Sequence, residues 1–202
     1  MSTEALYAAL KAELADTVWL DTALETVSRQ PAAIGRLFPA AGRRCGRWML
    51  ASPEGWSVDD AARVVLLDRL PREAAATEIE ALYRYGDAAE KRAVLRALPL
   101  LRLPAPVAGP LLLDALRTND TRLVAAALGP AAKALPAPAW RQGVLKAVFM
   151  QLPLSGVADL DARADAELAT MLAGLAEERR AAGRTLAADA TELLHRLQER
   201  VS

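Results

Sequence analysis

The sequence has very few of the residues that most often form cross-links and metal sites. It contains one cysteine, Cys45, and one histidine, His195, among 202 residues. A disulfide within the chain is therefore excluded, and so is a metal site built from the usual set of cysteine and histidine ligands. We expect no metal and no cofactor.

Residues that favour β-strands are also scarce. There are 12 valines, 2 isoleucines and 10 threonines, against 45 alanines and 34 leucines. Alanine and leucine are strong helix formers, whereas β-branched residues favour strands. The hydrophobic share of 53% is enough to bury a core and excludes a disordered chain. This composition predicts an all-α protein.

Neither sign of charge is in excess, since Lys+Arg and Asp+Glu both total 25. Nucleic-acid-binding proteins usually carry a basic surplus, so we expect no nucleic-acid partner. Acidic residues, among them Glu4 and Glu13, interrupt any apolar signal segment. The longest uncharged run, residues 147–158, falls short of the roughly 20 residues that span a bilayer. We therefore expect a protein of the cytoplasm and not an integral membrane protein, with peripheral attachment at the inner membrane as an alternative.

Helical periodicity runs through most of the chain, interrupted by proline and glycine. We predict an irregular array of about ten short antiparallel helices with HEAT-like stacking; a compact bundle is the alternative. The array is expected to form one domain over residues 1–202, divided into N-terminal helices (1–56), a repeat-like core (57–184) and a C-terminal helix (185–202).

Several local signals predict where individual helices begin and end. Glycines and arginines at 40–47 indicate a loop, and prolines at 103–110 indicate a linker. A helix is predicted for 72–85. The expected N-caps are Ser57, Asp87 (with Glu90 in a capping box), Asp120 and Asp161, and Gly183 is expected to end a long helix.

The charges are unevenly distributed along the chain. Residues 26–53 hold five arginines and no acidic residue, and residues 54–90 hold nine acidic residues against four arginines. A basic stretch can attract an anionic ligand or an acidic membrane surface. It can equally pair with neighbouring acidic helices.

No motif of a known enzyme class is present: the sequence lacks Gly-x-Gly-x-x-Gly, a Walker loop, Gly-x-Ser-x-Gly and His-Glu-x-x-His. Cys45 follows Arg43 and Arg44, which could lower a thiol pKa and produce a nucleophile. His195 could serve as a general base only with a partner and a pocket. A surface histidine and an inert cysteine are the simpler interpretations.

Polar side chains among apolar neighbours point to a binding surface, because a buried polar group needs a partner. Gln142 and Lys146 lie four residues apart in an otherwise apolar helix, and Arg117 and Asn119 lie in a polar turn. Their partners could be groups of the same chain or a ligand.

The order and spacing of several segments resemble the EboA family of bacterial metabolite-traffic proteins. The segments are LYRYGD (82–87), EKRAVLRALP (90–99), RTN (117–119), QGVLKAVF (142–149), DARADAEL (161–168) and ERRAAGR (178–184), with weaker likeness in LFPAAG (37–42). The chain departs from the family pattern at Trp140, Arg141 and Gly143, where Phe-Asn and a larger apolar residue are expected.

The resemblance implies an accessory protein that helps to move a secondary-metabolite precursor from the cytoplasm to the cell envelope. Its partners would be that precursor or proteins of the same gene cluster, among them a membrane prenyltransferase of the UbiA type. No catalytic activity is implied.

These observations together predict a non-enzymatic protein that binds a metabolite or a pathway partner. The expected binding residues are Arg117, Asn119, Gln142, Lys146 and Arg163, followed by Arg92 and Arg96 on another helix face. The alternatives are a helical-repeat scaffold that docks a cluster protein such as the prenyltransferase, and an unrecognised enzyme.

Overall fold

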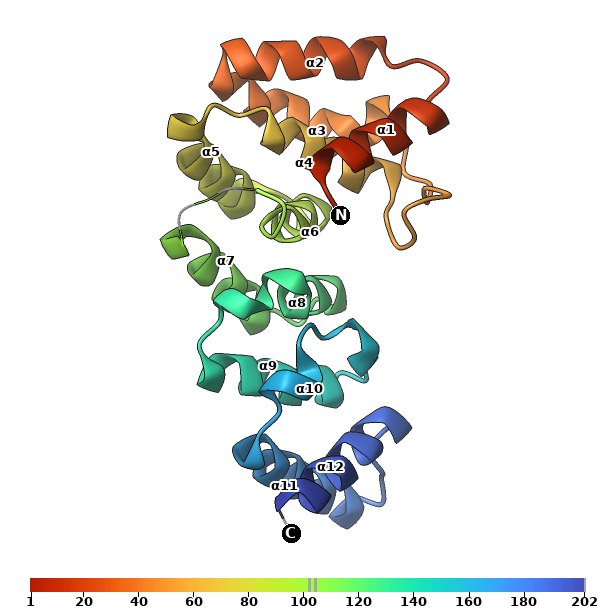
Figure 1. Cartoon of the computed structure of the whole chain (residues 1–202), viewed down its shortest axis with the longest axis vertical. Helices are drawn as coiled ribbons and strands as arrows, with labels where there is room; N and C mark the ends of the chain where they lie inside the picture. Colours follow the sequence, from red (N-terminus) through yellow and green to blue (C-terminus); the bar gives the residue numbers. More distant parts are fainter. Residues whose placement is uncertain (102, 104, 202) are drawn as a thin grey trace. The chain divides into compact units, whose positions relative to one another are not determined.

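The computed structural model describes residues 1–101, 103 and 105–201. These residues form twelve α-helices and three short 3-10 helices (Figure 1), and no strand is present among them. The predicted all-α class is confirmed. The elements in chain order are α1 (Thr3–Glu13), α2 (Val18–Arg29), η1 (Pro31–Ala33), α3 (Ile34–Arg44), α4 (Val58–Asp68), α5 (Arg72–Tyr85), α6 (Ala88–Ala97), α7 (Ala105–Arg117), α8 (Thr121–Leu128), η2 (Pro130–Ala134), α9 (Ala137–Phe149), η3 (Leu154–Gly156), α10 (Leu160–Arg163), α11 (Ala166–Ala181) and α12 (Ala188–Val201).

The chain divides into two compact units, Met1–Leu111 and Leu112–Ser202. The division falls within α7, not at residues 56 or 184. The expectation of one domain over residues 1–202 stays a prediction.

Helix α4 is the centre of the N-terminal unit. All of its residues from Val58 to Leu67 are buried, and α1, α3 and α6 pack against it (Figure 1). A helix covered on every side should be apolar throughout. Asp59, Asp60 and Arg63 break that rule, so each of them requires a partner inside the protein.

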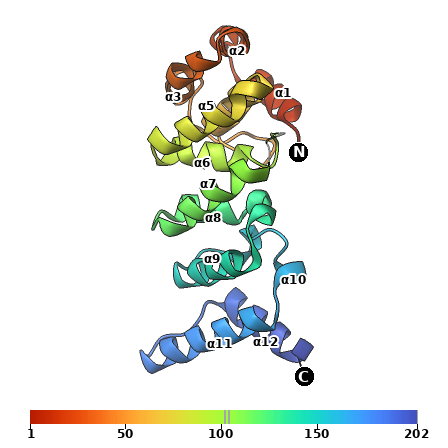
Figure 2. The ribbon, with the colours of Figure 1, turned by 90° about the vertical axis from the view of Figure 1, so that its left-hand side faces the viewer.

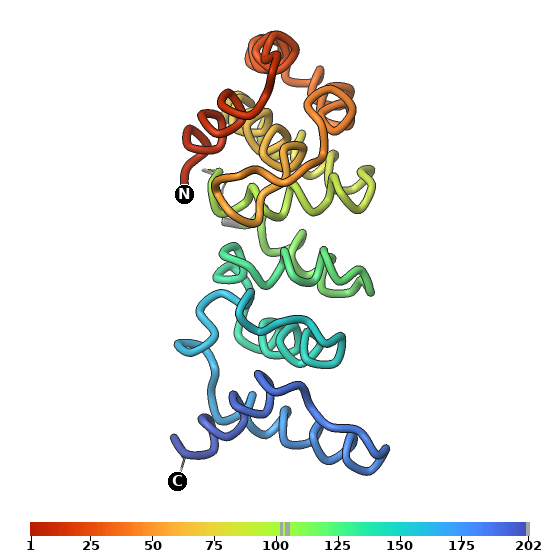
Figure 3. The backbone as a smooth tube through the Cα atoms, turned by 90° about the vertical axis from the view of Figure 1, so that its right-hand side faces the viewer, coloured from red at the N-terminus to blue at the C-terminus, as the bar shows by residue number. Residues whose placement is uncertain are grey.

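In the C-terminal unit, successive helices pack on one another. Helix α8 packs on α9, α9 on α11 and α11 on α12 (Figures 2 and 3). The predicted HEAT-like, antiparallel repeat goes beyond this packing and stays a prediction.

Most of the local signals read from the sequence coincide with helix ends. Helix α5 has the predicted bounds, and Asp87 and Glu90 form the capping box at the start of α6. The Asp120 carboxylate accepts from the backbone N–H of Arg122 at the start of α8. Gly183 has a φ of 69° after α11 and donates its N–H to the carbonyl of Arg180, as expected of the left-handed residue that follows a helix.

The predicted loop at 40–47 is wrong for residues 40–44, because α3 continues through Pro39 to Arg44; residues 45–47 lie in a loop, as predicted. An interior proline costs a helix about 3 kcal/mol, since it removes a hydrogen bond and crowds the preceding turn. Phe38, Ala41 and Gly42 are buried where α3 packs on α4. We attribute the continuation of the helix to this burial, which the local sequence does not reveal.

The predicted linker at 103–110 is also wrong from Ala105 onward, where α7 begins; residue 104 lies outside the described residues. Pro106 occupies the first turn, where a missing N–H has no cost. Val107 and Leu111 are buried and hold the rest of the segment in a helix around Pro110.

Asp161 does not cap the long helix as predicted. It lies in the single turn of α10, and Asp165 caps α11 by accepting from the N–H of Leu168 at 3.0 Å. Arg141 also donates to the Asp165 carboxylate. This contact from α9 fixes Asp165 at the start of α11, and sequence spacing alone could not show it.

Candidate functional site

A groove of about 310 Å³ lies between α7 and α9 in the C-terminal unit. Helix α7 supplies side chains at positions i, i+3 and i+4, and α9 supplies them at i, i+3, i+4 and i+7, which places each set on one helix face. The lining residues are Leu113, Leu116, Arg117, Ala139, Gln142, Gly143 and Lys146. Three of the seven predicted binding residues, Arg117, Gln142 and Lys146, therefore meet here.

Gly143 lets the two helices approach closely enough to form the groove floor. A Cβ atom at this position would lie 2.9 Å from Cδ2 of Leu128 and 3.2 Å from Cδ1 of Leu116. A larger side chain would have to displace both leucines. The glycine that departs from the family pattern thus has a packing role in this chain.

Lys146 joins the two walls of the groove. Its Nζ donates to the carbonyl oxygen of Leu116 at 2.8 Å, in the last turn of α7. The last carbonyls of a helix lack partners within the helix and carry partial negative charge, so a cation is stabilising there. An ammonium group has three donors, so this hydrogen bond leaves two for other contacts.

Arg117 and Gln142 are exposed at the edge of the same groove. Within the described part of the chain, neither side chain takes part in a hydrogen bond or an ion pair. The groove therefore presents a guanidinium group and an amide beside the Lys146 ammonium, next to the apolar side chains of Leu113 and Leu116. Such a surface can bind an acidic group that is attached to an apolar body.

Asn119 and Arg163 do not line the groove. Asn119 is exposed in the turn between α7 and α8. Arg163 donates to the carbonyl oxygens of Ala132 at 2.8 Å and Leu135 at 2.9 Å, and its guanidinium lies 4.7 Å from the ring centroid of Trp140. Burial lowers the pKa of Arg163, and its hydrogen bonds hold η2 against α10.

Arg92 and Arg96 are also held by partners in their own unit. Each donates to one oxygen of the fully buried Asp60 carboxylate at 3.0 Å. The Arg96 guanidinium lies 3.7 Å from the ring centroid of Trp56. Burial lowers the pKa of Arg96, although Asp60 acts in the opposite direction.

Asp59 and Arg63 form a second buried ion pair beside the Asp60 carboxylate. Arg63 donates to Asp59 at 2.7 Å and to the carbonyl oxygen of Phe38 at 3.2 Å. Burial would raise the pKa of Asp59, but hydrogen bonds from Ser57 and Arg63 hold it below its ordinary value. The i, i+4 spacing of Asp59 and Arg63 was the signal for this pair, because the spacing allows contact within one helix.

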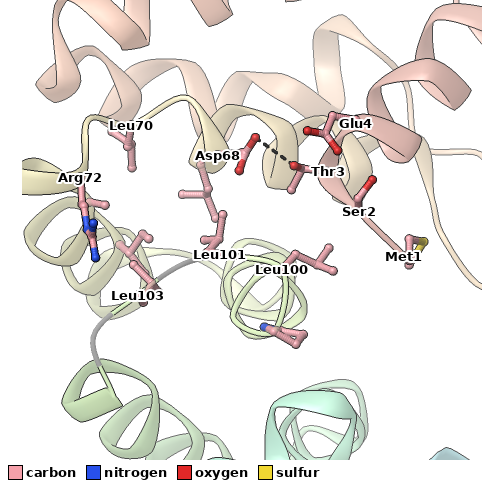
Figure 4. A pocket seen from close by; sticks show the side chains of 14 residues that line it. Met1, Ser2, Thr3, Glu4, Asp68, Leu70, Arg72, Leu100, Leu101 and Leu103 are labelled. Atoms are coloured by element: carbon pink, nitrogen blue, oxygen red, sulfur yellow. Dashed lines mark hydrogen bonds between the residues drawn. The ribbon is translucent and has the colours of Figure 1, made fainter.

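A larger cavity of about 520 Å³, which the sequence did not predict, lies in the N-terminal unit (Figure 4). Leucines such as Leu70, Leu100 and Leu101 line it, and Thr3 donates to Asp68 at 2.9 Å along one wall. Thr3 and Asp68 lie 65 residues apart in the sequence, so no local pattern could have indicated this cavity.

A comparison with known protein families shows to which family the chain belongs. A family model described as metabolite traffic protein EboA matches residues 38–195. The chain belongs to the EboA family. The EboA match covers every residue of the α7–α9 groove and confirms the family resemblance seen in the sequence. No curated protein and no solved structure matches the chain.

Membership of the EboA family places the chain among proteins named for metabolite traffic. Among the described residues, no three histidine, cysteine or acidic side chains are grouped so that they could hold a metal ion. No helix of the described residues is both long and apolar enough to cross a membrane. His195 is exposed on α12.

Proposed function

We propose that this EboA-family protein is a non-enzymatic carrier that binds an acidic metabolite precursor in the α7–α9 groove. The observation that supports the proposal is the exposed guanidinium of Arg117 and the Lys146 ammonium beside an apolar wall. Neither cation pairs with a carboxylate of the described residues. An acidic ligand would supply the missing negative charge.

The composition of the groove suggests how such a ligand would bind. A carboxylate or phosphate would accept hydrogen bonds from Arg117 and Lys146, and Gln142 could donate to or accept from a neighbouring polar group. The apolar part would lie on Leu113 and Leu116. A volume of about 310 Å³ suits one aromatic ring or a short isoprenoid chain, at the small end of ligand pockets.

The side chains of the groove favour binding over catalysis. Nucleophilic or acid–base catalysis needs a nucleophile or a base within hydrogen-bond reach of the reacting group. The lining of the groove has two cations, one amide and four apolar residues or glycine. These groups can hold an anion and orient it.

The family description supports a proposal for the cellular role. We propose that the protein receives the precursor in the cytoplasm and passes it toward the cell envelope. A UbiA-type membrane prenyltransferase or another protein of the cluster would be the donor or the recipient. Asn119, which is exposed beside the groove, could contact such a partner.

The test is a binding titration of the purified chain by calorimetry with two probes. Geranyl diphosphate represents a phosphate on an isoprenoid, and 4-hydroxyphenylpyruvate represents a carboxylate on an aromatic ring. Arg117→Gln should lower the affinity for the probe by about tenfold or more, because a hydrogen bond to a charged group contributes about 1.5–3 kcal/mol. Arg184→Gln, which removes an exposed arginine after α11, is the matched control and should bind like the wild type.

The results separate the three functional hypotheses. Equal affinity of wild type and Arg117→Gln for both probes, or no affinity at all, would contradict a ligand site in the groove. Binding of a purified cluster protein without either probe would favour the scaffold. Conversion of a probe by the purified chain, followed by mass spectrometry, would show an enzyme.

A further inference from the structure

The segment between α3 and α4, residues 45–57, leaves the packed helices of the N-terminal unit as a loop with a defined shape (Figure 1). Leu50 and Trp56 are buried and anchor it to the core. The N–H of Leu50 donates to the carbonyl of Trp56 at 2.7 Å, and the N–H of Val58 donates to the carbonyl of Trp48 at 2.9 Å. The loop is therefore held as a narrow hairpin.

This hairpin exposes two large apolar side chains to solvent. Trp48 is 50% exposed and Met49 is 58% exposed. Gly46 has a φ of 104°, and a Cβ atom there would lie 1.8 Å from the Trp48 ring, so the indole rests directly on the glycine backbone. The indole Nε1 donates to the Glu13 carboxylate at 3.4 Å. The local structure thus holds the indole at the surface.

Three exposed arginines flank these side chains. Arg43 and Arg44 end α3, and Arg47 directly precedes Trp48. None of the three has an ion-pair partner among the described residues. They belong to the stretch 26–53, which has five arginines and no acidic residue. Glu13 contacts the hairpin at Trp48 and Ala51, and Glu54 lies within it.

We propose that Arg43, Arg44, Arg47, Trp48 and Met49 form a docking surface for an anionic lipid bilayer. Arginines near a bilayer are attracted to anionic headgroups, and tryptophan favours the membrane–water interface because its ring is apolar and its N–H is polar. The exposed methionine adds apolar area beside the indole. The arginines match the negative charge of the headgroups, and the two apolar side chains match the acyl chains. An anionic bilayer presents both over a wide area.

This inference does not depend on the α7–α9 groove. A protein that collects a precursor at one site and docks through another can approach a membrane enzyme without a transmembrane helix. The two proposals use different residues, so each can fail alone.

The test is sedimentation of the full chain with lipid vesicles. Binding is expected to vesicles of phosphatidylcholine with phosphatidylglycerol and not to phosphatidylcholine alone, and it should weaken with added salt. Arg43→Gln/Arg44→Gln should reduce the affinity by about 30-fold, because each arginine near the surface contributes about 1 kcal/mol. Arg69→Gln/Arg84→Gln removes the same charge at two exposed positions, the residue after α4 and a residue of α5, and should bind like the wild type.

A second measurement reports on the tryptophan itself. Vesicles with brominated lipids should quench the fluorescence of the wild type. Trp48→Phe should lose most of that quenching, because Trp56 and Trp140 are buried and the half-buried Trp19 lies on α2, outside the docking surface. Circular dichroism checks that each variant is folded. Equal binding to neutral and anionic vesicles, no binding, or an unchanged Arg43→Gln/Arg44→Gln variant would overturn the proposal. Arg117→Gln should bind vesicles normally, which keeps this result separate from the groove.

Discussion

At the scale of single residues, the predicted arginines differ in whether the folded chain provides them with a hydrogen-bond or ion-pair partner. Arg92, Arg96, Arg117 and Arg163 were all predicted from the sequence to be binding residues. The fold places the Asp60 carboxylate against Arg92 and Arg96, and two carbonyl oxygens against Arg163. Arg117 has no such partner in the described structure. The free arginine is the stronger candidate for binding a ligand.

Cys45 shows the same effect of the fold on a single side chain. Its two preceding arginines could have produced a reactive thiol, although an inert cysteine was the simpler interpretation, and the side chain is buried. Burial raises the pKa of the thiol to about 11, although the Arg63 guanidinium acts against this. Cys45 is therefore an inert core residue near neutral pH.

We expect Cys45 to react with Ellman's reagent at pH 8 only when the protein unfolds. With a pKa of about 11, only about one thiol in a thousand is ionised at pH 8, against about one in four for a free cysteine. The raised pKa means that burial of the thiol stabilises the fold below about pH 8.5 and that this contribution is lost as the pH rises toward 11. Labelling in buffer and in guanidinium chloride checks the prediction, and rapid labelling of the native protein at pH 8 would contradict it.

At the scale of helices, local signals were reliable where they concern the backbone of one turn. The capping box of Asp87 and Glu90 and the residue after α11, Gly183, satisfy backbone groups within a few residues of themselves. The wrong predictions concern positions where a contact with a residue distant in the sequence determines the local structure. Pro39 remains within α3 because Phe38 and Ala41 are buried, and Asp165 replaces Asp161 as a cap where Arg141 reaches it.

Removal of Asp165 should therefore destabilise the protein more than removal of Asp161. Asp165→Ala loses the α11 cap and the three hydrogen bonds from Arg141, and an N-cap contributes about 1–2 kcal/mol. Asp161→Ala loses an exposed ion pair with Arg196, worth less than about 1 kcal/mol. Urea unfolding measures both free energies, and a larger loss for Asp161→Ala would contradict the assigned cap.

The loss of stability in Asp165→Ala should depend on pH, and the direction of that dependence follows from the pKa of Asp165. A hydrogen bond from Arg141 lowers the pKa of Asp165. A carboxyl with a lowered pKa stabilises the fold above its unfolded pKa of about 3.9 and loses that contribution as the pH falls through its folded value. The difference between wild type and Asp165→Ala should therefore shrink below about pH 4.

At the scale of the whole molecule, the chain divides into two compact units, and α7 runs through the division at Leu111 and Leu112. The core of the N-terminal unit includes the buried charges of α4. Its stability therefore depends on Asp60 and its two arginines, whose partners all lie within residues 1–111.

Replacement of Asp60 should show whether the units unfold separately. Asp60→Asn leaves two arginines without their carboxylate and should cost about 3 kcal/mol, in line with the loss of one partner of a buried ion pair. Because all the partners lie in one unit, we expect faster amide hydrogen exchange in α4 and α6 and little change in α8 and α9. Asp161→Asn, at an exposed position, is the control. Equal acceleration in both units would instead indicate one cooperative domain, as predicted from the sequence.

The sequence by itself determined the helical class, most of the caps and the family, because these depend on composition, on neighbours within one turn and on the order of short segments. It also placed Arg117, Gln142 and Lys146 among the binding candidates. Only the tertiary structure decided which candidates keep free donors and which proline-containing segments stay helical. Those outcomes depend on residues that lie far apart in the sequence, such as Arg141 with Asp165, 24 positions apart, and Arg96 with Asp60, 36 positions apart. Helix packing brings these residues together, and the energy of burial and pairing then outweighs local preference.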